Sequence, residues 1–166
     1  MGNAWNERQR TQKGLVIVNT GPGKGKTTAA LGTLLRAWGH GMRSFVIQFI
    51  KQPSEGMGGA DAARKFNIEW YQTDSGFTWV DKGTHDMADR ARKAWELAKE
   101  KIESADSDLI VLDEFTYPLL FDWLDTHDVV AWLRQHKRPL LHLVITGRGA
   151  PRELNAYAGL VTDRAM

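Results

Sequence analysis

A glycine-rich segment between an apolar run and a helical pattern constrains this sequence more than any other feature. The segment reads Gly21-Pro22-Gly23-Lys24-Gly25-Lys26-Thr27-Thr28. Glycine tolerates positive φ angles, so such a loop can turn several backbone N–H groups toward an anion at the start of a helix. Lys26 adds a positive charge, and Thr27 adds a hydroxyl that can ligate magnesium. The segment therefore predicts a phosphate-binding loop (P-loop) for a nucleotide.

The loop is one residue shorter than the usual pattern. The general form has four residues between its first glycine and the Gly-Lys pair. Here only three residues separate Gly21 from Gly25, and Thr20 stands in the usual first position. A plain glycine turn would explain the glycines, but it needs neither Lys26 nor two threonines at the start of the helix. We expect the tighter loop to hold the phosphates in a different register.

Short apolar runs alternate with helical patterns along the chain. We predict strands at 14–20, 44–50, 66–71, 109–112 and 140–145, and helices at 27–38, 60–65, 84–105 and 129–136. The first run lacks polar alternation, which is typical of a strand that is buried on both faces. Strand, helix and strand in succession indicate a right-handed parallel crossover. The fold class is therefore α/β, with a mostly parallel central sheet flanked by helices.

Length and composition favour one soluble domain. The 166 residues, 42% of them hydrophobic, suffice for one packed core. We assign residues 14–166 to this domain and 1–13 to a polar N-terminal extension. The net charge of +2 does not demand a nucleic-acid partner. The absence of cysteine fits a reducing cytoplasm. No apolar stretch approaches the roughly 20 residues of a membrane span.

Two acids follow the apolar run at 109–112. In a parallel α/β sheet, Asp113 and Glu114 would lie at the carboxyl edge, where ligands bind. A carboxylate there can hold magnesium, directly or through water. Two exposed acids at a strand end are the plain alternative. Glu114 could instead orient a water molecule for hydrolysis, as the second acid does in many ATPases.

Several segments in order resemble the ATP:corrinoid adenosyltransferase family, also called the cob(I)yrinic acid a,c-diamide adenosyltransferases. The segments run from about residue 14 to 163: Thr20 to Ala30, Arg36-Ala37, Gly39 to Gly41, Gln48 to Lys51, Gly76 to Trp79, Val111 to Glu114, Thr116-Tyr117 and Ile145 to Gly149. The resemblance implies a RecA-like P-loop NTPase fold. It implies ATP and a corrinoid as substrates, with Mg²⁺ as cofactor.

The implied reaction transfers the 5′-deoxyadenosyl group of ATP to cobalt(I), with tripolyphosphate leaving. In this family the short loop holds ATP in a reversed sense, so that the ribose 5′ carbon is exposed. By the resemblance, Phe77 and Trp79 crowd the lower face of the corrinoid and leave a four-coordinate cobalt(II) that is easier to reduce. From the residues alone, the segment 74–79 could equally be a satellite packing cluster. The resemblance therefore implies that Phe77, Trp79 and Lys26 are the catalytic residues of the protein.

The resemblance also implies the remaining ligands and partners. Glu114 would be a magnesium ligand with Thr27 and Asp113, and Arg148 would lie near the nucleotide. Arg36 is a second nominee for nucleotide binding, although exposed helix faces often carry such a residue. The implied partners are an electron-donating flavoprotein reductase and a second copy of the chain in a homodimer, without nucleic acid or membrane.

The sequence departs from the family at its two ends. Family members usually continue beyond the position of Asp163 with a tail rich in Lys-His and Gly that helps to close the site, whereas this sequence ends at Met166. The N-terminal extension is also brief, and in the family that region folds over the corrinoid pocket of a dimer partner. Two other functions stay open on the residues alone, an ordinary P-loop ATPase or kinase and a nucleotide-binding module.

Overall fold

A parallel β-sheet between two layers of helices forms the framework of the protein. The computed structural model describes residues 13–50, 58–73 and 84–165. The strands are β1 (Val16–Thr20), β2 (Ser44–Gln48), β3 (Glu69–Gln72), β4 (Leu109–Asp113), β5 (His142–Thr146) and β6 (Leu160–Asp163). The helices are α1 (Lys26–Gly39), α2 (Gly58–Lys65), α3 (Thr84–Glu103), α4 (Thr116–Leu120), α5 (Thr126–His136) and α6 (Arg152–Tyr157).

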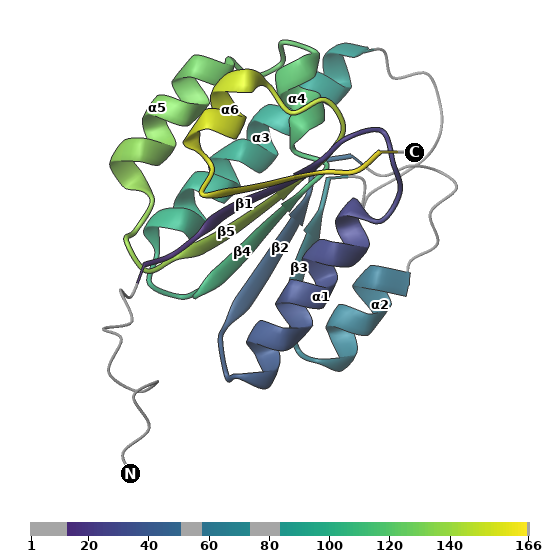
Figure 1. Cartoon of the computed structure of the whole chain (residues 1–166), viewed down its shortest axis with the longest axis vertical. Helices are drawn as coiled ribbons and strands as arrows, with labels where there is room; N and C mark the ends of the chain where they lie inside the picture. The colour runs from purple at the N-terminus through teal and green to yellow at the C-terminus, as the bar shows by residue number, and fades with distance from the viewer. Residues whose placement is uncertain (1–12, 51–57, 74–83, 166) are drawn as a thin grey trace.

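The sheet order is β3-β2-β4-β5-β1-β6, and every neighbouring pair is parallel. Helices α1 and α2 cover one face, and α3, α4, α5 and α6 lie over the other (Figure 1). Parallel strands need crossover connections, and the helices supply them on both faces. This is the predicted α/β fold of RecA-like P-loop type, with a sheet that is entirely parallel.

The central strands distribute their side chains between two cores. Ile110 and Leu112 of β4 pack on the side of α3 and α5, while Leu109 and Val111 pack on the side of α1. Every residue of β4 is buried. Because successive side chains of a strand point to opposite faces, a strand covered on both sides must be apolar throughout. That requirement explains the uninterrupted apolar run LIVL, from which the sequence predicts a strand.

Most predicted elements form within a few residues of the predicted bounds, and three elements are additional. Strand β3 begins at Glu69 rather than residue 66, because the chain turns at Asn67, which has a φ of 54°. The additional elements are α4, α6 and β6. Among the described residues, no helix combines the length and apolar composition needed to cross a membrane.

His142 begins β5 and joins it to the start of the first strand. Its Nδ1 accepts a hydrogen bond from the backbone N–H of Leu15 at 3.2 Å, which requires that nitrogen to be unprotonated. Burial lowers the pKa of the His142 imidazole below 6.5, Lys137 lowers it further, and Asp108 opposes the shift. The folded state therefore favours the neutral imidazole.

We predict that His142 makes the fold less stable in weak acid. Because its pKa is lower in the folded state, its contribution to stability is complete above pH 6.5 and is lost as the pH falls below that value. Urea unfolding at several pH values should show the wild-type midpoint falling more steeply below pH 6.5 than that of His142→Gln, which cannot titrate. Parallel curves for the two proteins would contradict this role.

Candidate functional site

The loop between β1 and α1 has the backbone that its glycines predict. Gly21 and Gly25 have φ angles of 95° and 93°, in the region that side-chain-bearing residues rarely adopt. Gly25 is the N-cap residue of α1, and because glycine has no side chain it cannot itself accept a hydrogen bond from the first N–H groups of the helix. The first N–H groups of a helix have no partner within the helix, and the helix dipole makes them attractive to anions. The loop is therefore built to receive a phosphate.

Lys26 directs its ammonium group into this loop. Its Nζ donates to the carbonyl oxygens of Gly21 at 2.9 Å and Gly23 at 2.6 Å, and the residue is only 7% exposed. A buried lysine needs such acceptors because desolvation of its charge is unfavourable. The positive charge thus lies inside the loop. Of the other predicted loop residues, Pro22, Lys24 and Thr28 are exposed to solvent.

Asp113 connects the loop to the carboxyl edge of the sheet. Its Oδ1 accepts hydrogen bonds from Thr27 Oγ1 at 2.8 Å and from Thr146 Oγ1 at 2.7 Å. Its Oδ2 accepts from Gln48 Nε2 at 2.9 Å, and Gln72 Nε2 donates to Gln48 Oε1 at 2.7 Å. Asp113 is 1% exposed, and three donors of this kind stabilise a buried carboxylate. Thr27 and Asp113, which the sequence nominates as magnesium-binding residues, therefore lie within hydrogen-bonding distance of each other.

Gln48 and Thr146 are part of the same network, although nothing in the sequence alone predicts a role for them. Both are buried polar residues that end a strand, at 7% and 0% exposure. The register places Gln48 directly beside Asp113. A buried polar residue at the end of an apolar strand is the signal that could have identified them, because the ends of parallel strands meet at one edge.

Glu114 follows Asp113 in a left-handed backbone conformation. Its φ is 57°, it is 7% exposed, and its N–H donates to Thr146 Oγ1 at 3.0 Å. A residue with a side chain adopts this conformation at some energetic cost, and such residues are concentrated at functional sites. The turn keeps the second acid at the edge of the sheet instead of releasing it to solvent.

The two predicted arginines differ in their positions. Arg148 is exposed in the turn after β5, and its carbonyl oxygen accepts from Thr116 Oγ1 at 2.7 Å, so it lies at the same edge as Asp113. Arg36 is exposed in the last turn of α1. Ten residues of helix separate it from Lys26, which corresponds to about 15 Å along the axis. The structure does not bring Arg36 to the loop. Phe77 and Trp79 lie outside the described residues.

The end of β6 and the residues that follow it pack against the loop. The N–H of Gly23 donates to the carbonyl oxygen of Arg164 at 2.8 Å, and the N–H of Arg164 donates to that of Thr20 at 3.0 Å. A Cβ at Gly21 would clash with the carboxylate of Asp163, and one at Gly23 would clash with the carbonyl oxygen of Ala165. Close packing of the chain around Asp163 to Ala165 thus requires glycine at both positions. At Gly21 the positive φ is a second reason.

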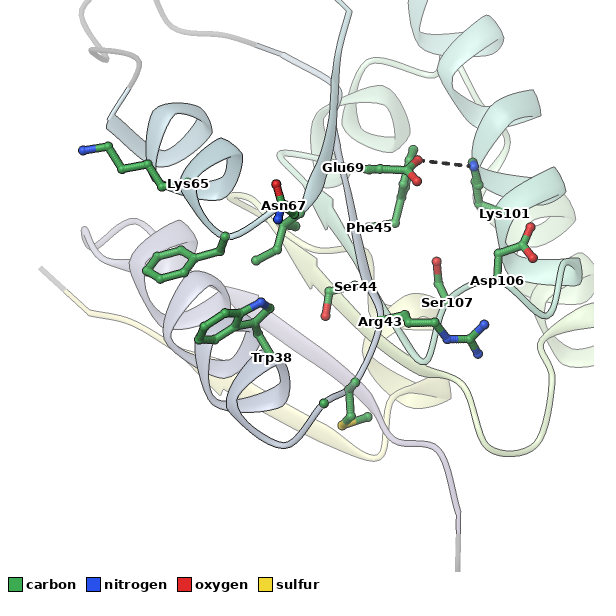
Figure 2. Close-up of a pocket in the computed structure, with 14 residues that line it drawn as sticks. Trp38, Arg43, Ser44, Phe45, Lys65, Asn67, Glu69, Lys101, Asp106 and Ser107 are labelled. Atoms are coloured by element: carbon green, nitrogen blue, oxygen red, sulfur yellow. Dashed lines mark ion pairs between the residues drawn. The ribbon is translucent and has the colours of Figure 1, made fainter.

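A hollow of about 480 Å³ lies at the opposite edge of the sheet, before β2 and β4. Figure 2 shows its polar walls, including the ion pair between Lys101 and Glu69, whose Nζ and Oε2 are 3.6 Å apart. The guanidinium of Arg43 is likewise paired with Asp108 at 3.0 Å. This hollow contains none of the residues around Asp113, and its charges are largely neutralised by partners. The candidate site is therefore the carboxyl edge.

The short glycine loop, the buried Lys26 and the hydroxyl–carboxylate pair of Thr27 and Asp113 define a P-loop nucleotide-binding protein. A family model described as ATP:corrinoid adenosyltransferase BtuR/CobO/CobP matches residues 12–166. The chain belongs to this family, as the resemblance of its motifs indicates.

Individual relatives agree. A corrinoid adenosyltransferase of a Sinorhizobium species is 39% identical over 164 residues, covering 93% of this chain and 73% of that protein. A corrinoid adenosyltransferase of Escherichia coli K12 is 36% identical over 154 residues, covering 92% and 76%. The flagellar accessory protein FlaH of Methanocaldococcus jannaschii has a similar fold, with a TM-score of 0.59 and 9% identity over 90% of this chain and 70% of that one.

We predict that Gly21→Ala destabilises the protein and abolishes measurable ATP binding. The substitution combines a positive φ with a clash against Asp163, and a strained residue of this kind costs on the order of 1–3 kcal/mol. Gly32→Ala is the matched control, because Gly32 lies within α1 and nothing lies within 4 Å of its added Cβ.

Gly32→Ala should stabilise the protein by about 0.5–1 kcal/mol and leave ATP binding intact. Urea unfolding measures the stability of both variants, and calorimetric titration measures their ATP binding. Wild-type stability and affinity in Gly21→Ala would show that the described packing of the loop is wrong.

Proposed function

We propose that this protein transfers the 5′-deoxyadenosyl group of ATP to the cobalt(I) of a corrinoid and releases tripolyphosphate. The observation that carries the proposal is the shortened phosphate loop, folded around Lys26, in a member of the ATP:corrinoid adenosyltransferase family. A loop that holds ATP in the reversed sense would leave the ribose 5′ carbon open to attack. The corrinoid would be cobalamin or cobyrinic acid a,c-diamide, in adenosylcobalamin synthesis or salvage.

The proposed step is a displacement at carbon. The electron pair of cobalt(I) forms a bond to C5′ of ATP while the C5′–O bond breaks. The oxygen leaves with that bonding pair as part of tripolyphosphate. Since cobalt(I) is a strong nucleophile, the protein has to supply mainly alignment, a stabilised leaving group and exclusion of water.

The loop supplies the stabilisation of the leaving group. The N-terminus of α1 attracts the phosphates through its N–H groups and its dipole. Lys26 donates to two loop carbonyls in the structure described here. Phosphate oxygens are charged and form stronger hydrogen bonds with an ammonium than neutral carbonyls do. We infer that a bound triphosphate draws the ammonium of Lys26 away from one or both carbonyls.

The side chains around Thr27 are of the type that binds magnesium. Magnesium prefers oxygen ligands, and nucleotide sites usually provide one or two protein ligands while phosphates and waters supply the others. No cluster of three or more metal-binding His, Cys, Asp or Glu residues is present within the described ranges, and this site does not need one. Magnesium would neutralise charge on the leaving tripolyphosphate.

The three proposed ligands differ in their hydrogen bonding. Thr27 would offer its hydroxyl oxygen and Glu114 its carboxylate. Both oxygens of Asp113 accept hydrogen bonds from protein donors. Asp113 would therefore act through Thr27 or through a water molecule, as a residue that orients the direct ligand.

Phe77 and Trp79 would act on the corrinoid and not on ATP. By family resemblance they would displace the lower axial ligand of the corrinoid and so favour reduction of cobalt(II). Thr73, the last described residue before their segment, donates a hydrogen bond from its Oγ1 to the carbonyl oxygen of Phe49 at 2.8 Å, just beyond the end of β2. A flavoprotein reductase, a homodimer and a cytoplasmic location are further parts of the proposal.

We predict that anaerobic incubation with ATP, magnesium and chemically reduced cobalamin yields light-sensitive adenosylcobalamin and an equal amount of tripolyphosphate. Absorbance spectra measure the first product and ion chromatography the second. ADP as the nucleotide product would instead indicate a P-loop kinase or ATPase. Orthophosphate without adenosylcobalamin would refute the proposal.

We predict separate defects for the two halves of the site. Lys26→Ala removes charge-assisted hydrogen bonds to phosphate, so ATP affinity should fall at least about tenfold. Phe77→Ala and Trp79→Ala should bind ATP normally but lose the ability to use cobalt(II) corrinoid supplied with a reductase. Lys65→Ala, an exposed lysine at the end of α2, is the control for loss of charge. Equal loss of ATP binding and of cobalt(II) corrinoid use in Lys26→Ala, Phe77→Ala and Trp79→Ala would contradict this division of roles.

A further inference from the structure

Arg164 is held against the phosphate loop on both sides of its peptide unit. Its N–H donates to Thr20 and its carbonyl oxygen accepts from Gly23, as described above. Figure 1 shows the chain after β6 running beside the loop that leads from β1 into α1. Two backbone hydrogen bonds to the loop fix the point from which the Arg164 side chain starts.

The side chain of Arg164 extends to the start of α1. Its Nη1 lies 3.4 Å, and its Cζ 3.9 Å, from the position that a Cβ on Gly25 would occupy. Gly25 is the N-cap residue of the helix, with φ 93° and ψ 7°. The guanidinium therefore lies against the backbone that opens α1, where the helix dipole is positive. A second positive charge at a positive helix end is unfavourable without an anion.

No acid in the described part of the chain neutralises this guanidinium. The ion pairs formed there do not include Arg164. Its Nε is buried and donates to no described residue. A buried donor without an acceptor is unfavourable, so its retention calls for an explanation. An anion in the neighbouring loop would supply both the acceptor and the opposite charge.

We propose that Arg164 is a phosphate-binding residue of the nucleotide site, acting with Lys26 on the polyphosphate chain. An arginine offers up to five N–H donors in a planar fork that matches the spacing of phosphate oxygens. The two cations come from different parts of the chain, Lys26 from the loop itself and Arg164 from the segment that follows β6. Insofar as tripolyphosphate is the leaving group, this role rests on the proposed function. Binding of the polyphosphate itself does not.

The test compares Arg164→Gln and Arg164→Lys with wild type by calorimetric titration of tripolyphosphate and of magnesium–ATP, without corrinoid. Arg164→Gln should bind tripolyphosphate about tenfold more weakly, as expected for loss of a charge-assisted hydrogen bond. Arg164→Lys should restore part of the affinity. Arg152→Gln is the control, because Arg152 is an exposed arginine on α6. It should bind like wild type.

The melting temperature of the ligand-free variants distinguishes a binding role of Arg164 from a purely structural one. Under the proposal, both variants keep the backbone of residue 164, and Arg164→Gln also removes an unneutralised charge from the start of α1. The melting temperature of ligand-free Arg164→Gln should therefore equal or exceed the wild-type value. Wild-type affinity in Arg164→Gln would overturn the proposal. So would a lower melting temperature together with weak binding that lysine does not restore.

Kinetics separate this proposal from the proposed function. Arg164→Gln should raise the KM for ATP more than it lowers kcat, since the lost contact binds the phosphates before transfer as well as during it. If wild type binds tripolyphosphate in an Arg164-dependent way but forms no adenosylcobalamin, the adenosyltransferase proposal fails and the role of Arg164 stands. If adenosylcobalamin forms and Arg164→Gln has wild-type affinity and KM, the adenosyltransferase proposal stands and the role of Arg164 fails.

Discussion

The architecture of the site depends on the hydrogen bonds that the carboxylate of Asp113 accepts. Asp113 ends the most deeply buried strand and accepts hydrogen bonds from α1, β2 and β5. Without it, each of these elements would bring a hydrogen-bond donor that lacks this acceptor to the edge of the sheet, which is costly in a buried setting. One side chain thus joins four elements and holds Thr27 in place. The apolar strands provide the rigid support that such a network needs.

The sequence predicts the loop and the central strands well because each has a strong local signal. The run at 109–112 is apolar throughout because both of its faces are covered, and the glycines of the loop reflect φ angles that other residues avoid. The meeting of Thr27 with Asp113 also follows, since both must lie at one edge of a parallel sheet.

Other features depend on distant contacts that leave little local signal. Strand β6 has three exposed residues of four and lies at the edge of the sheet, so it lacks an apolar run. Helix α4 has only five residues and includes Pro118, and α6 has six. Short helices show too little periodicity to be recognised. The network partners Gln48 and Thr146 become visible only when the register of the strands is known.

The support of the loop by the chain after β6 has a consequence for how the protein is made. The strand β1 and its loop lie near the start of the sequence, but the groups that bond to Thr20 and Gly23 are synthesised much later. Closing so large a separation is entropically costly, and contacts of this kind form late in folding. A nascent chain therefore cannot assemble its complete phosphate loop until β6 has docked. Nucleotide binding therefore requires the complete folded sheet and not only the loop motif.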